Sequence, residues 1–144
     1  MIAVDTNILI YAHRSDVEWH AQARAHISSL AEGRVNWGIP WPCVHEFLAI
    51  VSHPRIYDPP STIADAADQV DAWLASPVAA LLGETEQHWD VLKDVLFAGR
   101  VRGPVVHDAR VAAICMANGV TEFWTADRDF SRFPKLAVRN PLQD

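Results

Sequence analysis

Residues 2–12 read Ile-Ala-Val-Asp-Thr-Asn-Ile-Leu-Ile-Tyr-Ala, and this stretch decides the fold. Its first three residues are apolar, as in a strand buried within a parallel sheet. The run stops at Asp5, and Thr6 and Asn7, both favourable helix N-caps, precede a second apolar segment. This order predicts strand, turn and helix, with a carboxylate at the strand end where open α/β sheets bind ligands. Taken alone, Asp5 is either such a ligand-binding group or merely a helix cap.

The rest of the chain alternates apolar segments with amphipathic ones. Further strands are expected at residues 35–41, 78–82, 120–125 and 136–138. Helices are expected between them, one ending at Glu32 and the others spanning residues 42–51, 61–76, 85–99 and 104–119. The alternation predicts a single α/β domain over residues 1–144, with a central parallel sheet of about four to five strands flanked by helices on both faces.

Local signals refine several helix boundaries. Ser15 and Glu18 have the spacing of a capping box before the second helix. Pro42 suits the first turn of the third helix, and Ser61 or Thr62 is expected to cap the fourth. For the fifth helix, Thr85 is the expected start, with its inward face formed by Trp89, Leu92 and Leu96.

The composition narrows the protein class. Half of the residues are hydrophobic, which is typical of a compact domain, and no apolar run approaches the ~20 residues of a membrane span. The N-terminus has no basic segment before its apolar residues, so no secretory signal is expected. Cys43 and Cys115 lack metal-ligand spacing and suit buried thiols in a reducing compartment. We therefore expect a cytoplasmic protein with no membrane partner.

The charge is unevenly distributed along the chain. The net charge is −6, but residues 1–99 hold 5 basic and 13 acidic residues, whereas residues 100–144 hold 7 basic and 5 acidic ones. A local patch rather than the total charge decides phosphate binding. The sequence therefore permits a nucleic-acid partner without requiring one.

Three aspartates are expected to converge at one edge of the sheet. Asp5 and Asp127 follow predicted strands, and Asp108 lies in the first turn of a predicted helix. Neighbouring carboxylates repel and raise one another's pKa unless a cation lies among them. An all-oxygen cluster suits Mg²⁺ or Mn²⁺, which can activate water and neutralise charge on a phosphodiester. Asp129 precedes a short turn that it is expected to cap, so Asp127 is the predicted ligand and Asp129 its support.

Other catalytic patterns are weaker. The six glycines are isolated, so the sequence has no phosphate-binding glycine loop. His45 beside Glu46, and His107 beside Asp108, resemble acid–base pairs, but neighbours on a helix point in different directions. Both histidines are expected in the core or as supports, and Cys43 with His45 lacks the remaining ligands of a zinc site. The six tryptophans are expected in the core rather than as platforms for stacking bases.

Four motifs together resemble the PIN-domain ribonucleases. They are Val-Asp-Thr-Asn at residues 4–7, His-Glu at 45–46, His-Asp-Ala at 107–109 and Thr-Ala-Asp-Arg-Asp-Phe at 125–130. Within that family the chain looks most like the VapC-type toxins of bacterial toxin–antitoxin systems, over essentially its full length. The resemblance implies a catalytic set of Asp5, Glu46, Asp108 and Asp127. It implies Thr6, Asn7 and Thr125 as supports, with Asp129 as a further acidic residue.

The resemblance also implies an activity and partners. A VapC-type toxin is expected to be an endoribonuclease that uses Mg²⁺, with Mn²⁺ as a substitute, held by Asp5, Asp108 and Asp127. It is expected to leave 5′-phosphate and 3′-hydroxyl ends, to form a homodimer and to be neutralised by a small cognate antitoxin covering the acidic cleft. The charge distribution suggests that RNA phosphates contact Arg100, Arg102, Arg128 and Arg132.

Two alternatives remain open from the sequence. A catalytically inactive PIN-like module would bind RNA or a protein without cutting. A phosphatase of the haloacid dehalogenase type would have a second aspartate two residues after the first, where this chain has Asn7.

Overall fold

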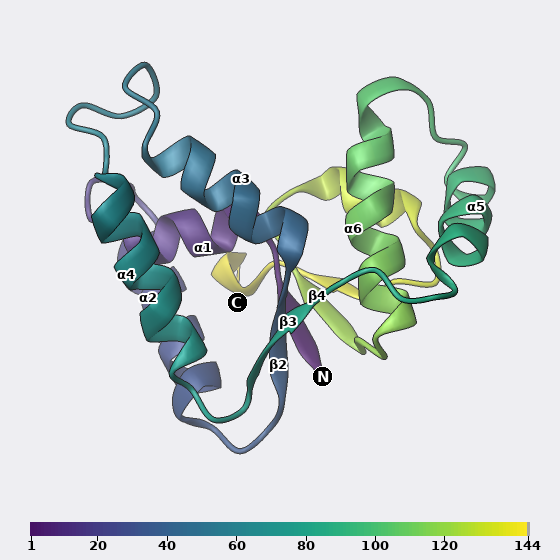
Figure 1. Cartoon of the computed structure of the whole chain (residues 1–144), viewed down its shortest axis with the longest axis horizontal. Coiled ribbons are helices and arrows are strands. Elements are labelled where there is room, and N and C mark those ends of the chain that lie inside the picture. Colours follow the sequence, from purple (N-terminus) through teal and green to yellow (C-terminus); the bar gives the residue numbers. More distant parts are fainter. Residues whose placement is uncertain (144) are drawn as a thin grey trace.

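A parallel sheet runs through the middle of the molecule (Figure 1). The computed structural model describes residues 1–143. Its five strands lie in the order β3-β2-β1-β4-β5, and every neighbouring pair is parallel. The strands are β1 (Ile2–Val4), β2 (Trp37–Pro40), β3 (Ala79–Leu82), β4 (Glu122–Trp124) and β5 (Val138–Arg139). Since β2 and β4 flank β1 on opposite sides, the strand order reverses at β1, which is where parallel sheets form ligand sites.

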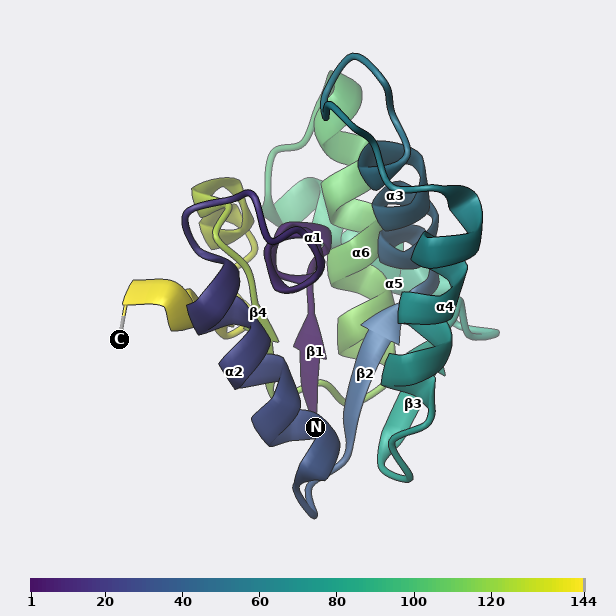
Figure 2. The ribbon, with the colours of Figure 1, turned by 90° about the vertical axis from the view of Figure 1, so that its left-hand side faces the viewer.

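Helices cover both faces of this sheet, as the alternating pattern predicted. They are α1 (Thr6–His13), α2 (His20–Glu32), α3 (Trp41–Val51), α4 (Ile63–Leu74), α5 (His88–Ala98) and α6 (Val106–Ala117). Helices α5 and α6 pack together on one face (Figure 1). Figure 2 shows α2 and α4 in front of β1 and β2, with α6 behind. Helix α3 packs against both α1 and α4. None of the helices within residues 1–143 is long and apolar enough to cross a membrane.

The junction of β1 and α1 is held by Asp5. Its backbone is still extended, and its N–H donates to the Trp124 carbonyl of β4 at 2.9 Å. Its side chain accepts the Thr6 N–H at 2.8 Å, so Asp5 is the N-cap of α1. Of the three residues that the sequence offered as caps, Asp5 is the cap, whereas Thr6 and Asn7 already lie within α1. Asp5 therefore both caps the helix and lies at the strand end.

The core is built from both sides of β1. Ala3 and Val4 are fully buried, as are Ile8 and Leu9 of α1. On β2, a Cβ at Gly38 would lie 2.8 Å from the Leu82 side chain, so glycine allows β3 to pack closely there. This close packing explains why β2 contains a glycine, although glycine makes the sequence of this segment less typical of a strand. The central strand and its helix thus form one buried unit.

The expected capping box at the second helix does not form. Helix α2 begins at His20 without a side-chain cap, and Ser15 and Glu18 lie in the turn before it. Arg14 pairs with Asp16 in this turn, and His20 Nδ1 lies 2.9 Å from the Tyr11 carbonyl oxygen. These contacts hold the segment as a turn, and the prediction failed because it used spacing alone.

Helix α5 also begins later than predicted. The Thr85 carbonyl accepts the His88 N–H at 3.0 Å in a tight turn, and the helix starts at His88. Trp89 was expected to face the core but is 62% exposed, whereas Val95 is the buried residue of this helix. Starting the helix three residues later shifts which side chains face α6.

The remaining boundaries agree closely with the sequence. Thr62 caps α4 by accepting the Asp65 N–H at 3.0 Å, and Pro42 lies in the first turn of α3. Pro104 was expected to start the last helix but lies within the short 3₁₀ helix η1 (Gly103–Val105), which leads directly into α6 at Val106. Two other 3₁₀ helices are η2 (Arg128–Arg132) and η3 (Pro141–Gln143). Strand β5 starts two residues later and ends one residue later than expected, because Leu136 is buried in a turn instead.

Candidate active site

An acidic cleft of about 470 Å³ opens at the carboxyl end of the central strands. Four carboxylates line it, each from a different element: the end of β1, α3, α6 and the turn after β4. These four residues are Asp5, Glu46, Asp108 and Asp127. They are far apart in the sequence and meet only because the parallel strands and following helices share one edge. The structure thus brings together all four residues of the predicted catalytic set.

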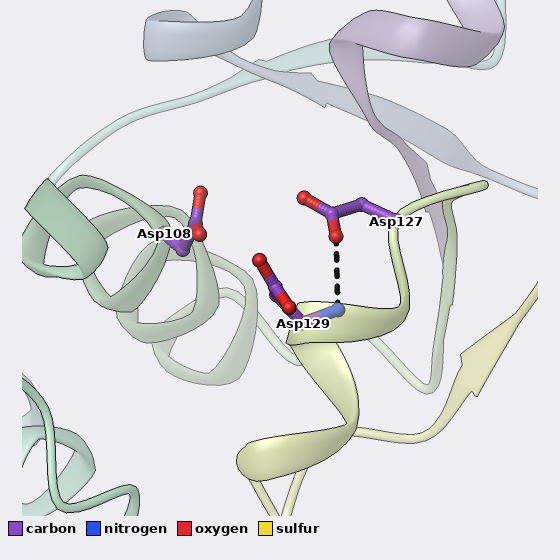
Figure 3. A group of neighbouring side chains, drawn as sticks. All are labelled: Asp108, Asp127 and Asp129. Atoms are coloured by element: carbon purple, nitrogen blue, oxygen red, sulfur yellow. Dashed lines mark hydrogen bonds between the residues drawn. The ribbon is translucent and has the colours of Figure 1, made fainter.

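Three aspartates form the tightest group at this cleft (Figure 3). Asp108 projects from the first turn of α6, and Asp127 and Asp129 from the turn into η2. One carboxylate oxygen from each lies within 4.8 Å of the others. Asp129 therefore lies within the same 4.8 Å limit as Asp108 and Asp127, and this limit alone does not rank it as a support.

The cap of η2 differs from the prediction. Asp127 Oδ1 accepts the Asp129 N–H at 2.9 Å, so Asp127 is the N-cap and Asp129 belongs to the first turn (Figure 3). The sequence placed the cap at Asp129. The prediction failed because the backbone turns into η2 two residues earlier, directly after the extended Asp127. Only Oδ1 of Asp127 accepts this hydrogen bond, so Oδ2 takes no part in the cap.

Asp5 lies in a different environment, buried with 7% of its surface exposed. Its Oδ1 accepts from the Thr6 N–H and, at 3.5 Å, from Cys43 Sγ. Its Oδ2 accepts from Thr125 Oγ1 at 2.7 Å and from Asn7 Nδ2 at 3.4 Å. Burial raises the pKa of Asp5 to about 6, although these hydrogen bonds from Thr125, Thr6 and Cys43 oppose the shift. The contacts from Cys43 and Asn7 are long for hydrogen bonds, and Asp5 lines the cleft despite its burial.

The residues predicted as supports join the two acidic regions. Thr125 Oγ1, besides donating to Asp5, accepts the Asp127 N–H at 3.0 Å and Asn7 Nδ2 at 3.2 Å. The Asn7 side-chain oxygen accepts the Ala126 N–H at 3.0 Å. The Asn7 amide thus both donates and accepts hydrogen bonds. An ionised carboxylate only accepts, so the second aspartate of a haloacid dehalogenase phosphatase could not replace Asn7 in this network. The network holds the turn after β4 against the start of α1.

The electrostatics of the cleft reflect crowded negative charge. Burial raises the pKa of Glu46, Asp127 raises it further, and His107 opposes the rise. Burial is also the largest cause of the raised pKa of Asp108, followed by Asp127, Asp129 and Glu46, with Arg132 opposing. A bound cation would relieve this repulsion. Three oxygen donors of one charge sign within 4.8 Å suit a hard divalent cation, so the residues present fit the ion expected from the sequence.

Two residues beside the site, the buried Cys43 and the cleft-lining Arg110, were not assigned a role there by the sequence. Cys43 Sγ donates to Asp5, and its position one helical turn before Glu46 is the signal that points to it. Arg110 lines the cleft two residues after Asp108, and its Nε donates to Glu84 at 2.8 Å. His45 and His107 also line the cleft, and both are exposed, so neither lies in the core; their role as supports stays a prediction.

The four predicted RNA-binding arginines are placed differently from one another. Arg132 is near enough to Asp108 to lower its pKa, and Arg128 lines a neighbouring hollow together with Asp127. Arg100 and Arg102 follow α5 and, within the described part of the chain, are not among the residues that line the acidic cleft.

Comparison with known proteins agrees with this arrangement. The family model described as PIN domain matches residues 2–136. The VapC ribonuclease Mb2897 of Mycobacterium bovis is 36% identical over 142 residues, covering 99% of this chain and 96% of the relative. Ribonuclease VapC48 of Mycobacterium tuberculosis is 26% identical over 138 residues, covering 96% and 95% of the two chains.

Solved structures share the fold at lower identity. VapBC2 from Rickettsia felis, bound to a promoter DNA fragment, has a TM-score of 0.70 at 16% identity and covers 97% of this chain and 98% of that one. Mycobacterium tuberculosis VapC20, a toxin that cleaves the sarcin-ricin loop, has a TM-score of 0.65 at 17% identity, with 91% and 93% covered. Since the family model spans most of the chain and a relative is 36% identical along nearly all of it, this chain belongs to the PIN-domain family, as a member of the VapC type.

Proposed function

We propose that the chain is an endoribonuclease toxin that hydrolyses RNA phosphodiester bonds with a divalent cation in the acidic cleft. One observation carries the proposal: carboxylates from four separate elements line a single cleft, and three aspartates lie within 4.8 Å of one another there. The names of the relatives, VapC ribonucleases from mycobacteria, support RNA as the substrate and hydrolysis as the reaction.

The ion would be held by Asp108 and Asp127, with Asp5 as the third ligand and Asp129 beside them. Bound there, Mg²⁺ or Mn²⁺ supplies Lewis-acid activation of water and neutralises charge on the phosphate. Asp5 is held by Thr125 and Thr6, so its carboxylate is oriented before any ion binds. Glu46, whose pKa is raised by burial and by Asp127, is suited to accept a proton from the attacking water at a carboxylate oxygen.

The partners follow from the same relationship. The Rickettsia felis structure is a VapBC2 assembly, and this supports a small cognate antitoxin as the partner of this chain. We propose that the antitoxin blocks the acidic cleft, that the toxin is a homodimer and that it acts in the cytoplasm. An antitoxin that reaches the cleft would compete with RNA, so the two could not bind at the same time.

The test uses the purified chain and end-mapped RNA. Mg²⁺ or Mn²⁺ should support cleavage that leaves 5′-phosphate and 3′-hydroxyl ends, and a chelator should stop it. Asp5→Asn should abolish cleavage, while the matched control Asp71→Asn, at an exposed carboxylate of α4, should cut normally. Wild-type cleavage by folded Asp5→Asn protein, or cleavage that persists in the chelator, would refute the metal-dependent site. Metal-independent RNA binding without any cutting would favour the inactive binding module.

A further inference from the structure

Trp41, at the start of α3, is an exposed aromatic residue next to Pro42 and His45, which line the acidic cleft. The sequence placed the tryptophans in the core, and Trp37, Trp73 and Trp124 are indeed buried. The prediction was wrong for the other three, since Trp19, Trp41 and Trp89 have 38%, 43% and 62% of their surface exposed. The ring centroid of Trp41 lies 5.8 Å from that of His45, which lines the cleft. An indole is apolar over most of its surface and carries a polar N–H, and such side chains are frequent at binding surfaces.

The local geometry makes the indole a supported surface. Trp41 and His45 lie four residues apart on α3, so they share one helix face, and their rings are inclined by 36°. On another edge, a Cβ added to Gly83 would lie 3.6 Å from Trp41 Cδ1, so the indole lies close to the segment after β3. The ring is therefore held along part of its perimeter while a large part of its surface faces solvent.

The position relative to the carboxylates is what a nucleic-acid site requires. Glu46 is the residue after His45, and both line the cleft that holds the aspartates. A phosphate bound at the aspartates would place the flanking nucleotides along the walls of this cleft. Because the cleft is acidic, attraction between charges contributes little to holding RNA there before an ion binds. A neutral stacking surface supplies affinity without that penalty, by about tenfold or more for each base.

We propose that Trp41, backed by His45, is a stacking platform for an unpaired base close to the scissile phosphate. The proposal rests on the ribonuclease function proposed above. It makes the preferred substrate single-stranded at the cleavage site, because a base in a continuous helix already stacks on its neighbours and is not free to lie on an indole. Trp41 is accordingly a specificity-determining residue, while the chemistry remains with the carboxylates.

The experiment compares binding of one RNA with and without individual bases. A fluorescent single-stranded oligonucleotide that the enzyme cuts is prepared with an abasic site at each position around the cleavage point. Binding is measured by anisotropy in an Asp108→Asn background, which keeps the RNA intact, and KM and kcat are measured with Mn²⁺ in the otherwise wild-type chain. The variants are Trp41→Ala, Trp41→Leu and Trp41→Phe, with Trp89→Ala as a control at a tryptophan that is 62% exposed on α5.

In the expected result, Trp41→Ala and Trp41→Leu weaken binding about tenfold and raise KM with little change in kcat. Trp41→Phe retains part of the affinity, and Trp89→Ala behaves like wild type. One abasic position near the cut should weaken wild-type binding but have no further effect in Trp41→Ala, since the two changes remove the same contact.

Several results would overturn the inference. If wild type cuts RNA and Trp41→Ala binds as tightly, the platform does not exist, although the ribonuclease function stands. If binding falls but every abasic penalty is unchanged, Trp41 acts through structure or as a contact between protein copies. If wild type neither binds nor cuts RNA with Mn²⁺, the proposed function itself fails. Trp41→Leu keeps a large apolar side chain but has no π-face. If Trp41→Ala does not fold, RNA binding by Trp41→Leu therefore tests the stacking contact.

Discussion

The acidic cleft has two regions in which the carboxylates differ in burial and in hydrogen bonding. Asp5 is buried and accepts hydrogen bonds from four groups, so its position is set by the protein alone. The Asp108–Asp127–Asp129 group is more exposed, and crowding among its own charges contributes to the raised pKa of Asp108. The comparison teaches that one region orients a carboxylate in advance, while the other leaves charge that a cation would neutralise.

The largest effect is expected from Asp127→Ala. This residue caps η2, receives support from Thr125 and lies in the three-aspartate group, so its loss removes a proposed ligand and loosens the turn. We expect the cleavage rate to fall by well over ~100-fold, beyond the usual loss from an outer partner, with no recovery at high Mn²⁺. Cleavage rate against Mn²⁺ concentration tests this, with a melting curve to show that the variant is folded. Recovery at high Mn²⁺ would assign Asp127 a supporting role.

Asp129→Ala should show a smaller defect of the same kind. Asp129 belongs to the group but is exposed, and its backbone N–H rather than its side chain bonds to Asp127. We expect activity to fall about 10- to 100-fold, partly recovered at high Mn²⁺. The same titration measures it beside Asp127→Ala. If Asp129→Ala is inactive at every concentration while Asp127→Ala recovers, the assignment of ligand and support is reversed.

Metal binding should stabilise the fold through the crowded region. Mn²⁺ at about 100 times its dissociation constant should add about 2.7 kcal/mol to the free energy of unfolding, because it binds only the folded cleft. Differential scanning fluorimetry of wild type and Asp108→Asn measures this, and the shift should largely disappear in the variant. Equal shifts in the two proteins would place the ion elsewhere.

The buried carboxylate of Asp5 should make the stability of the protein depend on pH. Because burial raises the pKa of Asp5 to about 6 from 3.8, the folded state binds its proton more tightly than the unfolded state between these values. Ionised Asp5 therefore costs stability above about pH 6, and this cost disappears as the pH falls through the window. In chelator at pH 7.5, Asp5→Asn should be more stable than wild type, by at most about 3 kcal/mol, while being inactive.

Melting temperatures of both proteins from pH 4 to pH 8 measure this difference, with ~0.5-unit steps through the window. The advantage of Asp5→Asn should shrink toward acid pH, and Asp71→Asn should show no such trend. An advantage that is constant with pH would mean that Asp5 is already ionised without penalty.

The smallest effect concerns the arginines. Reversing Arg128 and Arg132, which lie near Asp127 and Asp108, should flatten the salt dependence of RNA binding, by about 0.7 per lost phosphate contact. Reversing Arg100 and Arg102 was expected from the charge distribution to do the same. Equilibrium binding against salt concentration separates the pairs, and a change confined to Arg100 and Arg102 would place the RNA path beside α5 rather than at the turn after β4.

Local sequence determined much of this protein. The apolar run before Asp5 and the amphipathic run after it specify β1 and α1, because burial in a parallel sheet and helical periodicity are both local patterns. The same alternation along the chain predicted a parallel sheet covered on both faces, and the residues following two of its strands supplied Asp5 and Asp127. The motifs around Glu46 and Asp108 were recognisable through resemblance, although periodicity alone did not single out Glu46.

Only the tertiary structure decided how these residues meet. Asp127 rather than Asp129 caps η2, Cys43 reaches Asp5, and Trp41 is exposed while Trp37 is buried. The contacts of Cys43 and Thr125 with Asp5 join residues from distant parts of the chain, whereas the cap at Asp127 depends on where the backbone turns after β4. Sequence periodicity describes which face of an element is apolar, but hydrogen bonds, burial and charge repulsion between elements depend on where the sheet places their ends.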